Sequence, residues 1–161
     1  MTREQFIDHV KSTEKAFRRF LVALCCGDTS LADDIAQEAY IKAYVASETL
    51  KNPDKFKSWI FKIGYTTFIN HKRAEKTYNN YDDAREIAAS ESTDSQFQYQ
   101  ELYYALNKLP HKERTSVLLF YMEGYSIKEI ADIEQTSQSA VKQHLLRGRN
   151  HLHALMSNSQ K

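Results

Sequence analysis

The chain has 161 residues, 42% of them hydrophobic, with a formal net charge of +1, which suits one ordinary domain or two small helical ones. Nothing in it resembles a signal peptide and no apolar run approaches a membrane span, so we expect a soluble cytoplasmic protein without membrane insertion. Four Gly, two Pro and few alternating β-branched runs predict an almost entirely α-helical fold.

The first predicted helical segments run from about Phe6 to Leu24 and end at Gly27-Asp28. The adjacent cysteines Cys25 and Cys26 follow directly, and a disulfide between them would be strained. We therefore expect reduced thiols in the core, while a vicinal redox switch remains a minor alternative.

A second helix is predicted to open near Thr29 or Ser30, with a buried stripe made of Ala32, Ile35, Ala36, Ala39, Tyr40 and Ala43. Its opposite face carries, at i, i+3, i+4 and i+7, Asp34, Gln37, Glu38 and Ile41. On pattern alone this stripe fits an interaction face and a solvated face equally well.

The third predicted helix has the strongest start signal of the N-terminal half. Asn52 offers a cap, Pro53 suits the first helical position and Asp54 the first turn. Aromatic and cationic side chains alternate from there to Arg73, a pattern suited to melted nucleic acid because bases stack on aromatic rings while cations follow the phosphates. Trp59 fits the core better than a base contact, and the pattern leaves Tyr65 and Phe68 undecided.

Charge is sorted along the chain. Between positions 55 and 76 six Lys or Arg face one Glu, whereas between 77 and 101 six Asp or Glu face one Arg. Two basic stretches around an acidic segment predict two DNA-facing modules joined by a flexible linker, which we place at residues 1–76, 77–95 and 96–161.

The last module ends in a predicted helix-turn-helix. Ser126 and Glu129 form a capping box that starts a helix near Ile127, and Ser137 offers a second cap after a short turn. From Ser137 to Lys161 there are four Lys or Arg and no acidic residue, which suits a DNA-reading helix better than an ordinary helical hairpin. With Val141 and Leu145 buried, five residues would face outward: Gln138, Ser139, Lys142, Gln143 and Arg147.

Three blocks now carry a family resemblance. GDTSLADDIAQEAYIKAY (27–44) looks like the polymerase-binding part of sigma-70 region 2, and FKSWIFKIGYTTFINHKR (56–73) resembles the part that opens and reads the minus-ten promoter element. LPHKERTSVLLFYMEGYSIKEIADIEQTSQSAVKQHLLRGRNHL (109–152) is similar to region 4, which reads the minus-thirty-five element. The chain thus resembles the sigma-70 family of bacterial RNA polymerase specificity factors, in its short extracytoplasmic-function (ECF) group.

The resemblance implies three sets of binding residues. The set for the polymerase is Asp33, Asp34, Gln37 and Glu38. The set for minus-ten DNA, including a loop that cradles a flipped base, is Lys51, Asn52, Lys55, Lys62, Tyr65, Thr66, Asn70, Lys72 and Arg73. The set for minus-thirty-five DNA is Ser137, Gln138, Ser139, Lys142, Gln143, Arg147 and Arg149.

By the same resemblance, the partners are core RNA polymerase, promoter DNA and an anti-sigma factor, with the free chain a monomer and no cofactor or metal. The family usually has Leu-Gly where Glu134 and Gln135 stand, so the turn must adopt a left-handed residue without Gly at a cost of about 1 kcal/mol. Gly148 replaces a usual Ala and should loosen the recognition helix by a similar amount.

Two other classes of function were compared with this one. A stand-alone helix-turn-helix regulator with an N-terminal dimerisation or sensing domain would explain the C-terminus but not the 56–73 block. An enzyme would need a site such as His144, His151 and His153, whose spacing does not match a zinc pattern. We therefore expect no catalytic activity.

Overall fold

The computed structural model describes residues 1–78 and 94–159, and all regular structure within these two ranges is helical, as the sequence predicted. The N-terminal half consists of α1 (Arg3–Leu24), α2 (Thr29–Val45), the 3₁₀ turns η1 (Ser47–Thr49) and η2 (Pro53–Lys55), and α3 (Phe56–Tyr78). The C-terminal half consists of α4 (Asp94–Asn107), α5 (His111–Val117), the π-helical turn η3 (Leu118–Met122), α6 (Ile127–Glu134) and α7 (Gln138–Ser159).

The predicted helix starts are confirmed to within one turn. The Ser126 hydroxyl accepts from the Glu129 amide at 3.1 Å while the Glu129 carboxylate accepts from the Ser126 amide at 3.0 Å, so α6 begins with a complete capping box. Asn52 caps the turn at Pro53, but this turn is 3₁₀ and the α-helix begins only at Phe56.

The chain reverses direction between α1 and α2 through two left-handed residues, Cys26 (φ 55°) and Gly27 (φ 90°). Both cysteines are free and buried, which confirms the predicted core thiols. Burial raises the pKa of Cys25 to about 12, so its thiol stays protonated at neutral pH.

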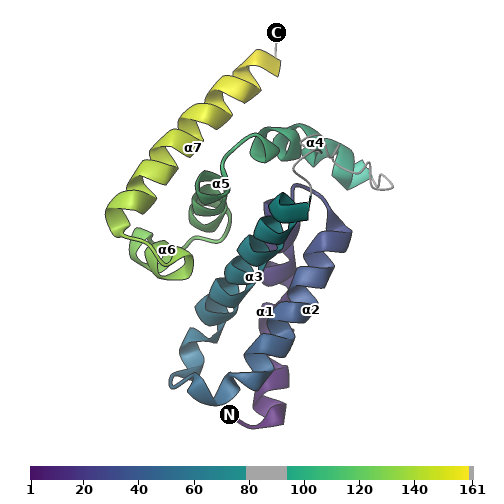
Figure 1. Cartoon of the computed structure of the whole chain (residues 1–161), viewed down its shortest axis with the longest axis vertical. Coiled ribbons are helices and arrows are strands. Elements are labelled where there is room, and N and C mark those ends of the chain that lie inside the picture. Colours follow the sequence, from purple (N-terminus) through teal and green to yellow (C-terminus); the bar gives the residue numbers. More distant parts are fainter. Residues whose placement is uncertain (79–93, 160–161) are drawn as a thin grey trace.

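Helices α1, α2 and α3 pack side by side as one bundle (Figure 1). Gly64 sets the closest approach within it, because a Cβ at this position would lie 2.5 Å from the ring of the fully buried Phe17. Aromatic rings fill the interior, and Phe61 stacks on Phe20 with 5.0 Å between ring centroids. Helices α1 and α2 thus hold α3 in place.

The two halves share one hydrophobic core. Helix α3 packs along α6, and α1 lies against η3, so the C-terminal half covers one side of the bundle (Figure 1). Most of the predicted linker, 77–95, lies outside the described residues, and the chain resumes in α4.

Candidate nucleic-acid interface

The predicted recognition helix is α7, and its outward face is solvent-exposed. The exposed residues are Gln138, Ser139, Lys142, Gln143, Arg147 and Arg149. The opposite face holds α7 in place, since Val141 is fully buried and Leu145 nearly so. The structure therefore confirms that α7 is amphipathic, with the exposed and buried faces that the sequence predicted.

Helix α7 approaches α5 closely at Gly148. A Cβ there would lie 2.7 Å from Cγ2 of Val117, so this position requires a residue without a side chain. Sequence reasoning assigned Gly148 only a cost in helix propensity. In the structure Gly148 also permits the contact that positions the recognition helix against the rest of the domain.

The turn of the helix-turn-helix takes the predicted left-handed residue without glycine. Gln135 has φ 56° and ψ 51°, and its amide bonds back to the end of α6. The Ser137 hydroxyl then accepts from the Ala140 amide at 3.1 Å and caps α7. The left-handed Gln135 and the Ser137 cap thus set the turn between α6 and α7.

One side chain of α7 that the sequence assigned to the DNA, Arg149, has a partner on another element. The guanidinium of Arg149 donates to the Tyr121 hydroxyl at 3.1 Å. Tyr121 belongs to η3 and is half-exposed, so it holds the Arg149 side chain at the surface. Sequence reasoning did not identify Tyr121, because nothing local marks a tyrosine 28 positions away as its partner.

The predicted minus-ten residues divide into an exposed group and a covered group. The exposed ones are Lys51, Asn52, Lys55, Thr66, Asn70 and Arg73. Lys72 is half-buried, pairing with Glu75 at 3.1 Å and lying 5.7 Å from the centre of the Phe68 ring. Helix α3 therefore presents cations near both of its ends.

The middle of α3 is covered by the C-terminal half. Tyr65 is only 6% exposed and Phe68 is fully buried, so the two aromatics that the pattern left undecided lie in the core. Burial, with the nearby Glu134 of α6, raises the pKa of Tyr65 to about 12. Trp59 is partly buried against the core, as the sequence favoured.

Helix α2, which carries the stripe, lies on the side of the bundle away from α6 and α7 (Figure 1). Asp33, Asp34 and Gln37 are exposed, and Ile41 is 66% exposed. Glu38 is held by His71 at 2.7 Å and by Lys42 at 3.3 Å, and the His71 hydrogen bond lowers the pKa of this carboxyl. An apolar side chain beside acidic ones, left open to solvent, is suited to a protein partner.

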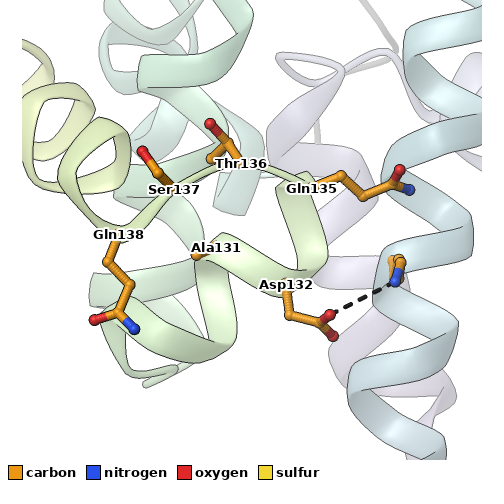
Figure 2. A pocket seen from close by; sticks show the side chains of 7 residues that line it. Ala131, Asp132, Gln135, Thr136, Ser137 and Gln138 are labelled. Atoms are coloured by element: carbon orange, nitrogen blue, oxygen red, sulfur yellow. Dashed lines mark ion pairs between the residues drawn. The ribbon is translucent and has the colours of Figure 1, made fainter.

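An open pocket of about 450 Å³ lies where the helix-turn-helix meets α3. Figure 2 shows Asp132 of α6 directed toward α3, where it pairs with Lys62 at 3.6 Å. The turn residues Gln135, Thr136 and Ser137 and the first residue of α7, Gln138, form the other side. Residues predicted for two different promoter elements thus line one pocket.

The comparisons with known proteins agree with this architecture. Residues 9–78 match the family described as Sigma-70 region 2, and residues 99–152 match Sigma-70, region 4. The RNA polymerase sigma factor SigV of Bacillus subtilis is 33% identical over 114 residues, which cover 71% of this chain and 69% of SigV. The ECF RNA polymerase sigma factor SigW of the same species is 31% identical, over 78% of this chain and 75% of SigW.

Two solved structures share the fold at lower identity. The sigma factor RpoE of Bartonella quintana, solved with the anti-sigma factor NepR, has a TM-score of 0.78 and 24% identity, and covers 94% of this chain and 96% of RpoE. CnrH, solved with the cytosolic domain of CnrY, has a TM-score of 0.74 and 22% identity over 98% of this chain and 90% of CnrH.

Regions 2 and 4 in this order, helical throughout the described residues, are the architecture of a promoter-specificity subunit of RNA polymerase. The chain belongs to the sigma-70 family of RNA polymerase sigma factors, in the ECF group. A sigma factor binds core RNA polymerase and directs transcription initiation at promoters, and it acts as an initiation factor. None of the described helices is long and apolar enough to cross a bilayer.

Proposed function

We propose that this sigma factor uses three separate surfaces, each on a different helix. The polymerase-binding surface is the α2 stripe of Asp33, Asp34, Gln37 and Glu38. The minus-ten surface is α3 with the loop before it, and the minus-thirty-five surface is the outward face of α7. The domain division at 1–76, 77–95 and 96–161 belongs to the same proposal.

The observation that carries this assignment is the outward face of α7. It combines three exposed cations, Lys142, Arg147 and Arg149, with exposed Gln and Ser side chains and no carboxylate on the same helix. Cations neutralise phosphates irrespective of sequence, whereas Gln can make paired hydrogen bonds to a base edge in the major groove. One face therefore offers both affinity and specificity.

The assignment of α2 to polymerase binding is supported by its acidic and apolar side chains, in contrast to the cationic face of α7. Its exposed carboxylates would repel DNA, while Ile41 and the neighbouring Val45, which is 79% exposed, offer apolar area to a protein. An acidic and apolar surface suits a protein that carries basic side chains.

We further propose that an anti-sigma factor regulates this chain in the cytoplasm, that the free chain is a monomer, and that it carries no catalytic activity. Two structures of the same fold were solved with such partners, NepR and CnrY. The stand-alone regulator is not favoured, because region 2 accounts for the N-terminal residues 9–78.

Run-off transcription with core polymerase, with and without the chain, tests the function. We expect a defined transcript only when the chain is present, and weak binding of promoter DNA by the chain alone. Asp34→Lys should impair association with core polymerase while leaving binding to a minus-thirty-five duplex unchanged. Arg147→Ala should weaken binding to that duplex while leaving association with core polymerase unchanged. An operator bound tightly without polymerase would instead indicate a stand-alone regulator.

A further inference from the structure

The π-helical turn η3 brings an exposed tyrosine beside the DNA-facing helix α7. Tyr121 of η3 is 55% exposed. Its hydroxyl accepts a hydrogen bond of 3.1 Å from Nη1 of Arg149, a residue 28 positions later in the chain. The residues assigned to minus-thirty-five DNA all lie between Ser137 and Arg149, so Tyr121 is a candidate contact from a different element.

Close packing of α7 on α5 brings Tyr121 and Arg149 together. A Cβ at Gly148 would lie 2.7 Å from Cγ2 of Val117, so the two helices approach as nearly as their backbones allow. Arg149 comes directly after Gly148. Tyr121 follows Val117 by about one turn of a helix that is widened at this point. The contact between Gly148 and Val117 therefore places the guanidinium of Arg149 within reach of the Tyr121 hydroxyl.

The Tyr121 ring is carried by a turn that is anchored in the core. Phe120 meets this ring edge-on with 5.0 Å between ring centroids, and Phe120 itself packs against the hydrophobic core. Leu118 and Leu119, earlier in the same turn, are buried. Because the turn is already held in place, the Tyr121 hydroxyl needs little ordering when a ligand binds.

The charges around this pair suit an anionic ligand. Arg149 and Arg147 are both exposed cations on α7. Glu123, which comes just after η3, has a completely buried side chain that pairs with Arg19 at 2.6 Å, so its negative charge is compensated. A phenol hydroxyl that accepts from a guanidinium keeps its own proton to donate. The pair can therefore offer a cation and a hydroxyl donor to the same phosphate.

We propose that Tyr121 is a DNA-binding residue that shares one phosphate of the minus-thirty-five duplex with Arg149. The Arg149 guanidinium provides the positive charge. The Tyr121 hydroxyl orients that guanidinium and donates its proton to an oxygen of the same phosphate. The minus-thirty-five surface thus extends from α7 onto η3. The proposal rests on the function assigned to α7 above.

Replacement of single phosphates tests the proposal with the full-length chain bound to core polymerase. The probe is a fluorescent promoter duplex that the wild-type chain with core polymerase selects from a random pool. One phosphate of its minus-thirty-five half at a time is replaced by an uncharged methylphosphonate. Tyr121→Phe removes only the hydroxyl and keeps the ring against Phe120, so urea unfolding should match wild type. Tyr104→Phe is a matched control, because Tyr104 is 58% exposed on α4.

Tyr121→Phe should weaken binding to the unmodified promoter about tenfold, the order expected for one hydrogen bond to a charged group. One methylphosphonate position should weaken binding of the wild type strongly but that of Tyr121→Phe and Arg149→Ala much less. This position should be the same for both variants, because both side chains contact the same phosphate. Tyr104→Phe should follow wild type at every position, and all variants should associate normally with core polymerase.

Other phosphate profiles would overturn the proposal. It fails if only one of Tyr121→Phe and Arg149→Ala loses sensitivity to a phosphate, or if the two lose it at different phosphates, because the side chains then share no phosphate. If neither variant changes the profile, Arg149 makes no phosphate contact and its assignment to the minus-thirty-five surface fails as well. If core polymerase with the wild-type chain selects no promoter, the proposed function itself fails.

Discussion

Glu134 provides the most quantitative prediction, because the structure buries this carboxyl at the turn between α6 and α7. It is 8% exposed and accepts one hydrogen bond, from the Ser116 hydroxyl at 2.6 Å. Its other oxygen has no hydrogen-bond partner among the described residues. Burial raises the pKa of Glu134 to about 7, against the opposing effects of Ser116 and Lys112.

The sign of the pH effect follows from this shift. A carboxyl whose folded-state pKa lies above its unfolded value stabilises the fold fully below the unfolded value of 4.5, and this contribution is lost as the pH rises through about 7. With 1.36 kcal/mol for each pKa unit, the ionised side chain costs about 2–3 kcal/mol at pH 8 relative to pH 5. Glu134→Gln cannot ionise and removes this cost.

His111 titrates in the opposite sense and must be separated from Glu134. Burial, with nearby cations led by Arg114, lowers the pKa of His111 to about 4, so its contribution is present above 6.5 and lost on acidification. Because His111 is unchanged in Glu134→Gln, its effect cancels when the variant is compared with wild type at each pH. The difference between the two proteins therefore reports Glu134.

Urea unfolding at pH 5, 6, 7 and 8 measures this difference as a free energy of unfolding. We expect Glu134→Gln to gain about 2–3 kcal/mol on wild type between pH 5 and pH 8. Glu134→Leu, which places the family's usual residue there, should show the same trend, whereas Glu101→Gln, at an exposed site on α4, should not. Parallel pH profiles for wild type and Glu134→Gln would refute the reasoning.

Further variants test packing, the turn and DNA contacts. Gly64→Ala should lower the free energy of unfolding by about 1–3 kcal/mol, because its Cβ would lie 2.5 Å from the buried Phe17 ring; calorimetry would show a lower melting temperature. Gln135→Gly should raise that free energy by about 1 kcal/mol in urea titrations, since a left-handed residue of φ 56° suits glycine. Arg147→Ala should weaken minus-thirty-five binding for all sequences and reduce the salt slope by about one. Gln138→Ala should instead reduce the preference for one base pair by about 1–3 kcal/mol of binding free energy, measured by competition between minus-thirty-five elements that differ at single positions.

Local features of the fold were predictable because they depend on residues a few positions apart. The capping box at Ser126 required only the sequence of one turn, whereas the left-handed residue at Gln135 was expected from the Leu-Gly pair that the resembled family usually has there. The buried face of α7 followed from helical periodicity. The resemblance to regions 2 and 4 then supplied the order of modules, which composition alone left open.

The packing between regions was not predictable in the same way. Arg19 and Glu123 are 104 positions apart, and both read as ordinary surface charges. Within residues 1–78 and 94–159, Arg114 is buried and bonded to backbone carbonyls, which no side-chain pattern marks in the sequence. Gly148 was assigned a propensity cost, while its role in close helix packing depends on Val117 of another helix.

The π-helical turn η3 gives one short stretch two different orientations. A π-turn accommodates an additional residue and so rotates the side chains that follow it. Tyr121 within η3 reaches Arg149, and Glu123 immediately after it reaches Arg19. Removing a single residue from this turn would rotate both side chains about the helix axis together, so the position of Arg149, which we assign to the DNA backbone, and the contact between the two halves of the chain depend on the same turn.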